Sequence, residues 1–536
     1  MTNLNQMVST NKTAYIELLL FLAIFFSSAY FHHPVEYDNS KSRFFLISSI
    51  VDFKTLDIDA YHAWTQDKSY YNGHYYSNKA PGGPLLGVPV YWILTWFKNN
   101  TDPPLSLSDR YIIRLVTTAI PFAITGILLF RIGFAWCNSE RRALLMVLAY
   151  SFGSIAFQHS TLFSGHQLAA SFSFFSFYLI YSLSAAKTEK DTILKKSICA
   201  FSAGLFAGIG ALADYTAMFL AVIISLYVLI SVTEKRYLLL FFGGGFICII
   251  ILTLYNYSCF GSIFSLSYGH QATEAFKKGS ESGFLGVSIP DPKALFQILF
   301  SPSHGLFFIM PVFIYSIVGF CYLFQKKEFT REGLILLSIV TGYLAINAGF
   351  YAWHGGWSFG PRYIVPMLPF LALPMVFSPV ENKFFSALLF LSVFQVGISV
   401  AGFPHVPEVI RNPIFEIILP CMKYGYFAQN IGNLFSLRGV WSIIPLLLFS
   451  IIAVAMLLSK IQKKDVMGRQ HPQIVKILSL LWFCIIVVVL ACYRTPNQRL
   501  VHGNRSLLLM DAAIMMDSDK IKEKAISEMK LSNDLE

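Results

Sequence analysis

Long runs of apolar residues, separated by short polar segments, recur along the chain from Tyr15 to Cys492. The runs are about 16 to 25 residues long, and a helix of about 20 residues crosses the ~30 Å hydrocarbon core of a bilayer. A transmembrane strand would alternate polar and apolar residues, whereas these runs are apolar at consecutive positions. The pattern therefore predicts an all-α polytopic membrane protein.

Taking each long apolar run as one span predicts about 13 transmembrane helices. They are expected at residues 14–31, 111–135, 143–159, 165–185, 198–212, 215–232, 237–258, 305–324, 332–351, 363–378, 384–402, 440–459 and 474–492. A further apolar stretch at 84–97 opens with Pro and Gly and is short for a span. Runs of this length more often lie at the membrane interface, so we predict that it does not cross.

The distribution of charge sets the orientation. The net charge is +11, which in a soluble chain would suggest a nucleic-acid partner, but only 13% of the residues are charged and 55% are hydrophobic. Lys and Arg sit mainly between the spans. With a cytoplasmic N-terminus, the inner loops carry them roughly four times as densely per residue as the later outer loops. This excludes a soluble enzyme and predicts no nucleic-acid partner.

This orientation predicts two parts: a transmembrane domain at 1–492 and a charged, extracytoplasmic tail at 493–536. The first extracytoplasmic loop, residues 32–110, is the largest, and 259–304 and 403–439 are further outer loops. Loops longer than about 15 residues are mostly functional when they lack structure of their own. We therefore expect the chemistry to face outward.

The first outer loop holds the most candidate chemistry. Asp57 and Asp59 precede an aromatic segment that contains Tyr61, and a carboxylate there could take a proton from an acceptor hydroxyl or hold a divalent ion. A solvated loop is the structural alternative. Lys79 precedes the Pro- and Gly-rich residues 80–84, where the loop becomes apolar. Its ammonium could meet a lipid phosphate at headgroup depth, or simply snorkel to the interface.

Two further outer segments contribute candidates. His166 opens a predicted span, as a structural hydrogen-bonding residue or as a metal ligand. His354 and Arg362 lie before another span, and Arg362 enters a helix N-terminus, where anions are favoured; an interfacial anchor is the alternative. Asp214 lies between two closely spaced spans. It is either a functional group or a solvated turn residue.

Three segments together resemble a known family. They are Asp-x-x-x-Tyr at 57–61, Lys-Ala-Pro-Gly at 79–82, and Gly-Pro-Arg-Tyr-x-x-Pro-x-x-Pro at 360–369. Their order and spacing are similar to those of the GT-C superfamily of membrane glycosyltransferases, nearest to the protein-mannosyltransferase-like bacterial branch that includes the lipid A aminoarabinose transferases. The resemblance runs from the first loop to about residue 378.

The resemblance implies a GT-C fold with about 13 transmembrane helices and interfacial helices in the first loop. It implies a bacterial inner-membrane enzyme that moves a sugar from a polyprenyl-phosphate donor to a lipid, glycan or protein acceptor on the extracytoplasmic face. No cofactor is certain, and a divalent metal ion stays open.

The same resemblance implies roles for particular residues. Asp57 matches the first position of the family's Asp-Glu-x-x-Tyr, and Asp59 falls one residue after its Glu, so either could be the base. Lys79 lies where the family's Lys meets the carrier phosphate. On physical grounds, Arg362 could supply a second cation to the charge that develops on that phosphate. The remaining candidates for contacts with substrate or metal are His166, His354, Tyr61 and Tyr363.

Two other functions fit a protein with many spans. A transporter or flippase would place ionisable residues at mid-membrane depth and show internal repeats, and few such features are visible. A polysaccharide polymerase would carry Arg-rich outer loops, whereas the loop at 259–304 has only Lys277, Lys278 and Lys293. Both stay as alternatives to the glycosyltransferase.

Overall fold

The computed structural model describes residues 2–33, 37–98, 105–185, 192–461, 498–516 and 519–534, with isolated positions between 477 and 488. Within these residues the regular secondary structure is helical apart from one two-stranded hairpin and isolated bridges, which confirms the predicted all-α class. The predicted span at 474–492 lies largely outside the described residues.

Six helical segments in the described part are long and apolar enough to cross a membrane. They are Leu107–Cys137 (α4, Leu107–Arg114, η3, Leu115–Ala119, and α5, Ile120–Cys137), α9 (Ile193–Ala213), α11 (Lys235–Phe260), Lys327–Gly349 (mostly α16, Thr330–Gly349), α18 (Lys383–Ala401) and Gly439–Lys460 (mostly α21, Ile444–Lys460). Further apolar helices lie among them: α1 (Thr2–Ala29), α8 (Gly165–Ala185), α10 (Met218–Ser231) and α15 (Ile314–Leu323). The chain is a multi-pass membrane protein.

Three predicted spans are broken rather than continuous. The segment predicted at 363–378 is a 3₁₀ turn, η8 (Arg362–Met367), followed by α17 (Leu368–Ala372) and η9 (Leu373–Phe377). Its three prolines lack the backbone N–H that a continuous helix needs. The segment predicted at 143–159 divides into α6 (Glu140–Ser151) and α7 (Ile155–Ser160), and α14 (Leu306–Ile309) precedes η6 (Pro311–Phe313) before α15.

The short apolar stretch that was predicted not to cross forms α3 (Gly82–Thr95), a helix of 14 residues. Such a helix is about 21 Å long, which is too short for the hydrocarbon core. Its buried side contacts α2 (Asp38–Ser48) and α4, while Trp92 within the helix and Trp96 at its C-terminal cap are exposed. Aromatic side chains in this position are typical of an interfacial helix.

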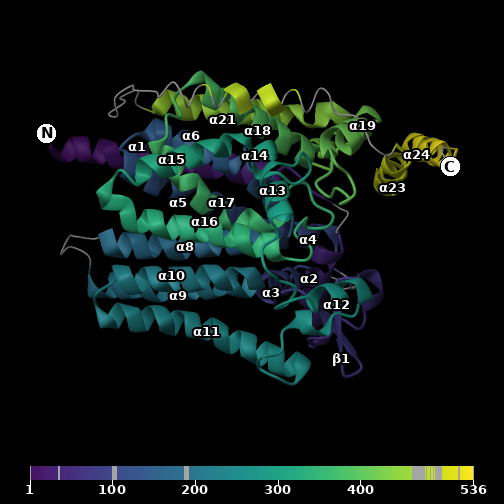
Figure 1. Cartoon of the computed structure of the whole chain (residues 1–536), viewed down its shortest axis with the longest axis horizontal. Helices are drawn as coiled ribbons and strands as arrows, with labels where there is room; N and C mark the ends of the chain where they lie inside the picture. Colours follow the sequence, from purple (N-terminus) through teal and green to yellow (C-terminus); the bar gives the residue numbers. More distant parts are fainter. Residues whose placement is uncertain are drawn as a thin grey trace.

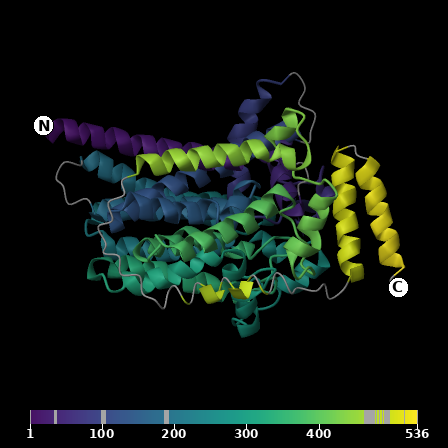
Figure 2. The same ribbon diagram turned by 90° about the horizontal axis from the view of Figure 1, so that it is seen from above.

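The long helices lie side by side, and the short elements gather at one end, on the right in Figure 1, which we call the loop end. It contains α2, α3, α12 (Glu274–Ser280), α13 (Pro292–Phe300) and the hairpin of β1 (Lys68–Tyr71) and β2 (His74–Ser77). The helices α23 (Gln498–Met516) and α24 (Asp519–Asn533) stand beyond this end in Figure 2.

Loops far apart in sequence meet at the loop end. Phe31 forms a bridge with Asn430, and Ser69 forms one with Gln271. At the opposite end, Arg141 and Glu381 form an ion pair at 3.4 Å between two linkers that the charge distribution assigns to the cytoplasmic side. The outer loops thus meet at the loop end, and the linkers that contain Arg141 and Glu381, which the charge distribution assigns to the cytoplasmic side, meet at the other end of the bundle.

Glycines allow α9 and α11 to pack backbone against backbone. A Cβ built at Gly204 of α9 would lie 1.7 Å from the carbonyl oxygen of Phe241, and one built at Gly244 of α11 would lie 2.2 Å from that of Phe201. Small residues at such contacts let transmembrane helices approach closely, because little hydrophobic driving force remains between helices in lipid.

We predict that Gly204→Ala lowers the melting temperature of the purified protein, because α9 and α11 must separate. Overpacking of this kind costs about 1–3 kcal/mol. The matched control is Gly243→Ala, on the neighbouring helix α11, where an added Cβ would have nothing within 4 Å. Thermal unfolding in detergent measures both, and an equal loss in the two variants would contradict the packing argument.

Candidate functional site

Five charged side chains gather at the loop end, and we call them the charge cluster. Three are cations, Arg43 of α2, Lys79 after β2 and Arg362 at the start of η8; two are carboxylates, Asp67 before β1 and Asp214 after α9. All except the partly exposed Arg362 are at least nine-tenths buried. Buried charges are stable only when they compensate one another, so these loops depend on each other for their charge balance.

Lys79 and Asp67 form the central ion pair of the cluster, with Nζ 3.0 Å from Oδ1. Burial would raise the pKa of Asp67, but Lys79, the amide of Asn78 and the more distant Arg362 outweigh it and hold that pKa below its usual value. Burial lowers the pKa of Lys79, and the positive charges of Arg43 and Arg362 lower it as well, whereas Asp67 raises it. The Lys79 ammonium is therefore held among other cations rather than free in solvent.

The Lys-Ala-Pro-Gly motif positions Lys79 through the close approach of Gly82 to the end of α9. A Cβ at Gly82 would lie 2.4 Å from the carbonyl carbon of Leu212, so a larger residue would push the motif away from Asp214. Hydrogen bonds fix the other side: Ser267 Oγ donates to the carbonyl oxygen of Asn78 at 2.9 Å. The motif thus joins three loops at one point.

The two arginines of the cluster keep unused hydrogen-bond donors. Arg43 donates from Nη1 to the carbonyl oxygen of Asn39 at 3.0 Å, and Arg362 donates from Nη2 to the hydroxyl of Tyr363 at 3.2 Å. The Nε atoms of both arginines are buried without a hydrogen-bond partner. An unsatisfied buried donor costs about 1–3 kcal/mol, and an anion that accepted from it would remove that cost.

Gly355 makes room for Arg362. It has φ of +81°, and a Cβ at this position would lie 3.0 Å from Cγ of Arg362. Both the backbone conformation and the contact favour glycine. Gly355 therefore allows its backbone to lie close to the Arg362 side chain.

Asp214 pairs with His166 through Oδ2 and Nδ1. Its other oxygen accepts hydrogen bonds from the backbone N–H and the hydroxyl of Thr216, each at 3.0 Å. Burial would raise the pKa of Asp214, but His166 and Thr216 outweigh it and lower the pKa to about 2. The solvated-turn alternative for Asp214 is wrong, since the carboxylate is buried and orients an imidazole. That ring meets Tyr363 edge-to-face, with centroids 5.2 Å apart.

Asp57 and Asp59 form a separate group with His74 at the hairpin. Asp59 accepts from the backbone N–H of Tyr75 at 2.6 Å and lies 2.7 Å from Nδ1 of His74. Among the described residues, Asp57, Asp59 and His74 are the one group of ligand atoms close enough to hold a metal ion, all within 4.8 Å of one another. No contact between these aspartates and the charge cluster is recorded in the described part, so their catalytic role stays a prediction.

The other predicted substrate contacts are distributed around the loop end. His354 lies 3.0 Å from a carboxylate oxygen of Glu408, and burial lowers its pKa. Tyr61 is buried and stacks on Phe45, with centroids 5.0 Å apart, so its ring packs in a small apolar core. Tyr363 contacts both Arg362 and His166. The structure thus brings Lys79, Arg362, Tyr363 and His166 to the cluster.

Two members of the cluster were missed by reasoning from sequence. Arg43 belongs to no motif, and nothing in the sequence around it marks it as functional. Asp67 is one of seven aspartates in the first loop, and residue type alone does not separate it from Asp57 and Asp59. Only the fold shows that Asp67 is the partner of Lys79.

No protein-family model matches the chain, and the search of curated proteins returned no match. The structure is similar to the crystal structure of ArnT from Cupriavidus metallidurans in the apo state, with 12% identity and a TM-score of 0.46 over 84% of this chain and 76% of that chain. The same protein bound to undecaprenyl phosphate matches with 12% identity and a TM-score of 0.41, over 89% of this chain and 74% of that one.

The archaeal oligosaccharyltransferase AglB from Archaeoglobus fulgidus, in complex with an inhibitory peptide and a dolichol-phosphate, matches with 12% identity and a TM-score of 0.43. That match covers 96% of this chain and 60% of the other. At 12% identity, these similarities concern the overall fold. Because the identities are this low, the chemistry of the site is argued from the chain's own side chains.

Three more histidines at the loop end are held neutral. Burial and then Arg114 lower the pKa of His32 to about 4. Burial is also the largest cause for His304 and His405, which both lie near Arg362, and lowers the pKa of each to about 3. In the unfolded chain each would have a pKa of about 6.5.

We predict that these histidines make the protein less stable in acid. Below pH ~6.5 the unfolded chain binds protons that the folded chain does not, so each histidine lowers the stability by up to about 1.4 kcal/mol per pH unit until its folded pKa is reached. The melting temperature should therefore fall between pH 7 and pH 5. His405→Gln should reduce that fall.

The control for this prediction is His74→Gln. His74 is exposed, and its pKa is raised by its hydrogen bond to Asp59, so its removal should not reduce the loss of stability in acid. If both substitutions reduced the fall equally, or neither did, buried histidines would not be its cause.

Proposed function

We propose that this protein is a GT-C glycosyltransferase that transfers a sugar from a polyprenyl-phosphate donor to an acceptor at the loop end, on the extracytoplasmic face. The observation that carries the proposal is the charge cluster: three cations against two carboxylates, with two buried guanidinium Nε atoms that lack acceptors. A single anionic phosphate would balance this charge and accept from those donors.

The charge cluster could stabilise a lipid phosphate as the leaving group of the transfer reaction. As the sugar leaves, negative charge develops on the phosphate oxygens, and preorganised cations in a site of low dielectric stabilise that charge. Arg362 is the partly exposed member and offers the route of access, while Arg43 and Lys79 are buried. The apolar helices around the loop end would accept the polyprenyl chain from the bilayer.

Two groups are candidates for the base that activates the acceptor hydroxyl. The family resemblance favours Asp57 or Asp59. The geometry adds a second candidate, His166, whose Nδ1 is held by Asp214 so that the other ring nitrogen could take a proton. In that arrangement Asp214 is a positioning residue that stabilises the imidazolium.

We predict that Lys79→Gln and Arg362→Gln each weaken binding of undecaprenyl phosphate by about 10-fold to 100-fold, because each removes a charge-assisted hydrogen bond worth about 1.5–3 kcal/mol. Binding to the purified protein is measured by tryptophan fluorescence or calorimetry. Lys277→Gln, an exposed cation of α12, is the matched control. Unchanged affinity in both cluster variants would overturn the phosphate site.

A second prediction separates the candidate bases. Loss of a general base lowers the transfer rate by about 10²- to 10⁴-fold while leaving the affinity for donor nearly unchanged. The rates of Asp57→Asn, Asp59→Asn and His166→Gln are compared by following release of polyprenyl phosphate from a labelled polyprenyl-phosphate sugar in membranes. The variant with the largest loss identifies the base, and full activity in all three would refute both assignments.

A further inference from the structure

A cavity of about 360 Å³ lies on the other side of α2 from the charge cluster. Four of its lining residues come from one face of α2: Lys41, Phe44, Phe45 and Ser48. Their spacing of three and four residues puts them on a single helical stripe, while Arg43 points away from it into the charge cluster. The two faces of α2 therefore serve two separate places in the protein.

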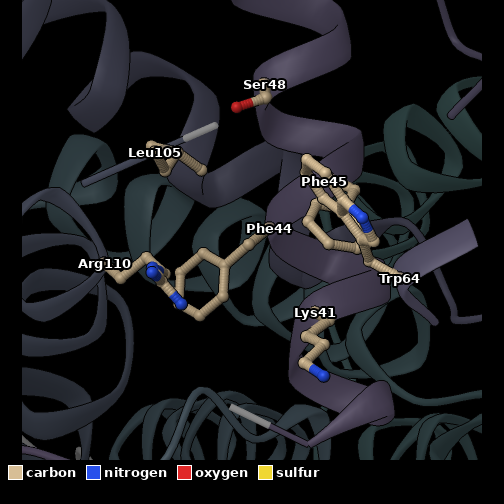
Figure 3. A pocket seen from close by; sticks show the side chains of 7 residues that line it. All are labelled: Lys41, Phe44, Phe45, Ser48, Trp64, Leu105 and Arg110. Atoms are coloured by element: carbon tan, nitrogen blue, oxygen red, sulfur yellow. The ribbon is translucent and has the colours of Figure 1, made fainter. Parts of the chain in front are cut away.

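The lining of the cavity combines apolar and cationic side chains. Figure 3 shows Leu105 and Arg110 on one side of the cavity and Phe45 and Trp64 on the other, with Phe44 between them. The two charged residues that line it, Lys41 and Arg110, are both cations, and no acidic side chain lines it in the described part of the chain. An occupant should therefore be anionic at one end and apolar at the other.

Arg110 has no competing partner among the described residues. Its Nε is buried without a hydrogen bond, and no ion pair is recorded for it. The adjacent carboxylate of Asp109 is engaged by Lys98 and by the backbone N–H of Ser106. Lys41 has an exposed, loose ion pair with Asp38 at 3.8 Å and a more distant interaction with the charge of Asp511. Both cations are thus available to an external anion.

The depth of the cavity fits a membrane lipid. Arg110 lies in the first turn of the membrane-spanning segment Leu107–Cys137, which places its guanidinium near the headgroup region. The neighbouring interfacial helix α3 contacts both α2 and α4 and exposes Trp92 and Trp96, as side chains at this depth commonly do. The volume is within the range of small-molecule sites, roughly 300–1,000 Å³.

We propose that this cavity binds an anionic glycerophospholipid of the surrounding leaflet, with its phosphate between Arg110 and Lys41 and its first methylene groups against Phe44 and Phe45. The site is separate from the proposed donor site and does not depend on transferase activity. Because α2 carries Arg43 on its other face, the bound lipid also holds that helix in place.

The test is lipid binding by the full-length protein, measured by native mass spectrometry with phosphatidylglycerol and with phosphatidylcholine as the zwitterionic comparison. We expect selective retention of phosphatidylglycerol. Arg110→Gln combined with Lys41→Gln should lower its apparent affinity by at least about tenfold, and Arg110→Lys should keep part of it. The double variant Lys277→Gln with Lys278→Gln removes the same charge from the exposed α12 and should bind as the wild type does.

A second measurement uses the intact wild-type site, in case the double variant does not fold. Phosphatidylglycerol brominated near the ester end of its acyl chains should quench the fluorescence of Trp64, seen as the difference between the wild type and Trp64→Phe. Equal retention of both lipids, or no quenching assigned to Trp64, overturns the proposal. Displacement of the bound lipid by equimolar undecaprenyl phosphate also overturns it, because the cavity would then belong to the donor.

Discussion

The loop end depends on the need to compensate charges that are out of contact with water. Arg43, Lys79, Asp67 and Asp214 come from four separate segments, and each is at least nine-tenths buried. An uncompensated charge in such a place is costly, so no one of these segments can move without leaving the others unbalanced. The broken helix that begins at Arg362 adds the third cation. The site is therefore held by the same interactions that would bind a phosphate.

The helix α2 connects this cluster to the membrane surface. One of its faces delivers Arg43 to the cluster, and the other lines the cavity with Lys41, Phe44 and Phe45. A short helix packed on both faces has little freedom to rotate, because a turn that improved one face would disrupt the other. The position of Arg43 is thus coupled to whatever occupies the cavity, through a rigid element rather than through loop motion.

The parts of the structure set by the bilayer could be predicted from the sequence, because a fixed hydrocarbon thickness imposes a fixed length of apolar helix. The class, the helical segments and the short α3 follow from that constraint. The breaks in the helix after Arg362 could not be predicted from the sequence, since prolines weaken a helix without fixing where the chain turns. The pairing of Lys79 with Asp67 rather than with Asp57 or Asp59 depends on the hairpin register and on loops distant in sequence, which residue type does not reveal.

The balance of charge also bears on the order of events in the proposed reaction. A polyprenyl-phosphate sugar is a phosphodiester with one negative charge, which matches the one-unit positive excess of the cluster when His166 is neutral. Transfer leaves a phosphomonoester, whose charge near neutral pH approaches two units because its second pKa is about 6. If His166 takes the proton of the acceptor, its imidazolium supplies the additional positive charge and the cluster stays balanced. A base on the exposed hairpin would leave that extra negative charge uncompensated, so the pairing of His166 with Asp214 favours a base inside the cluster.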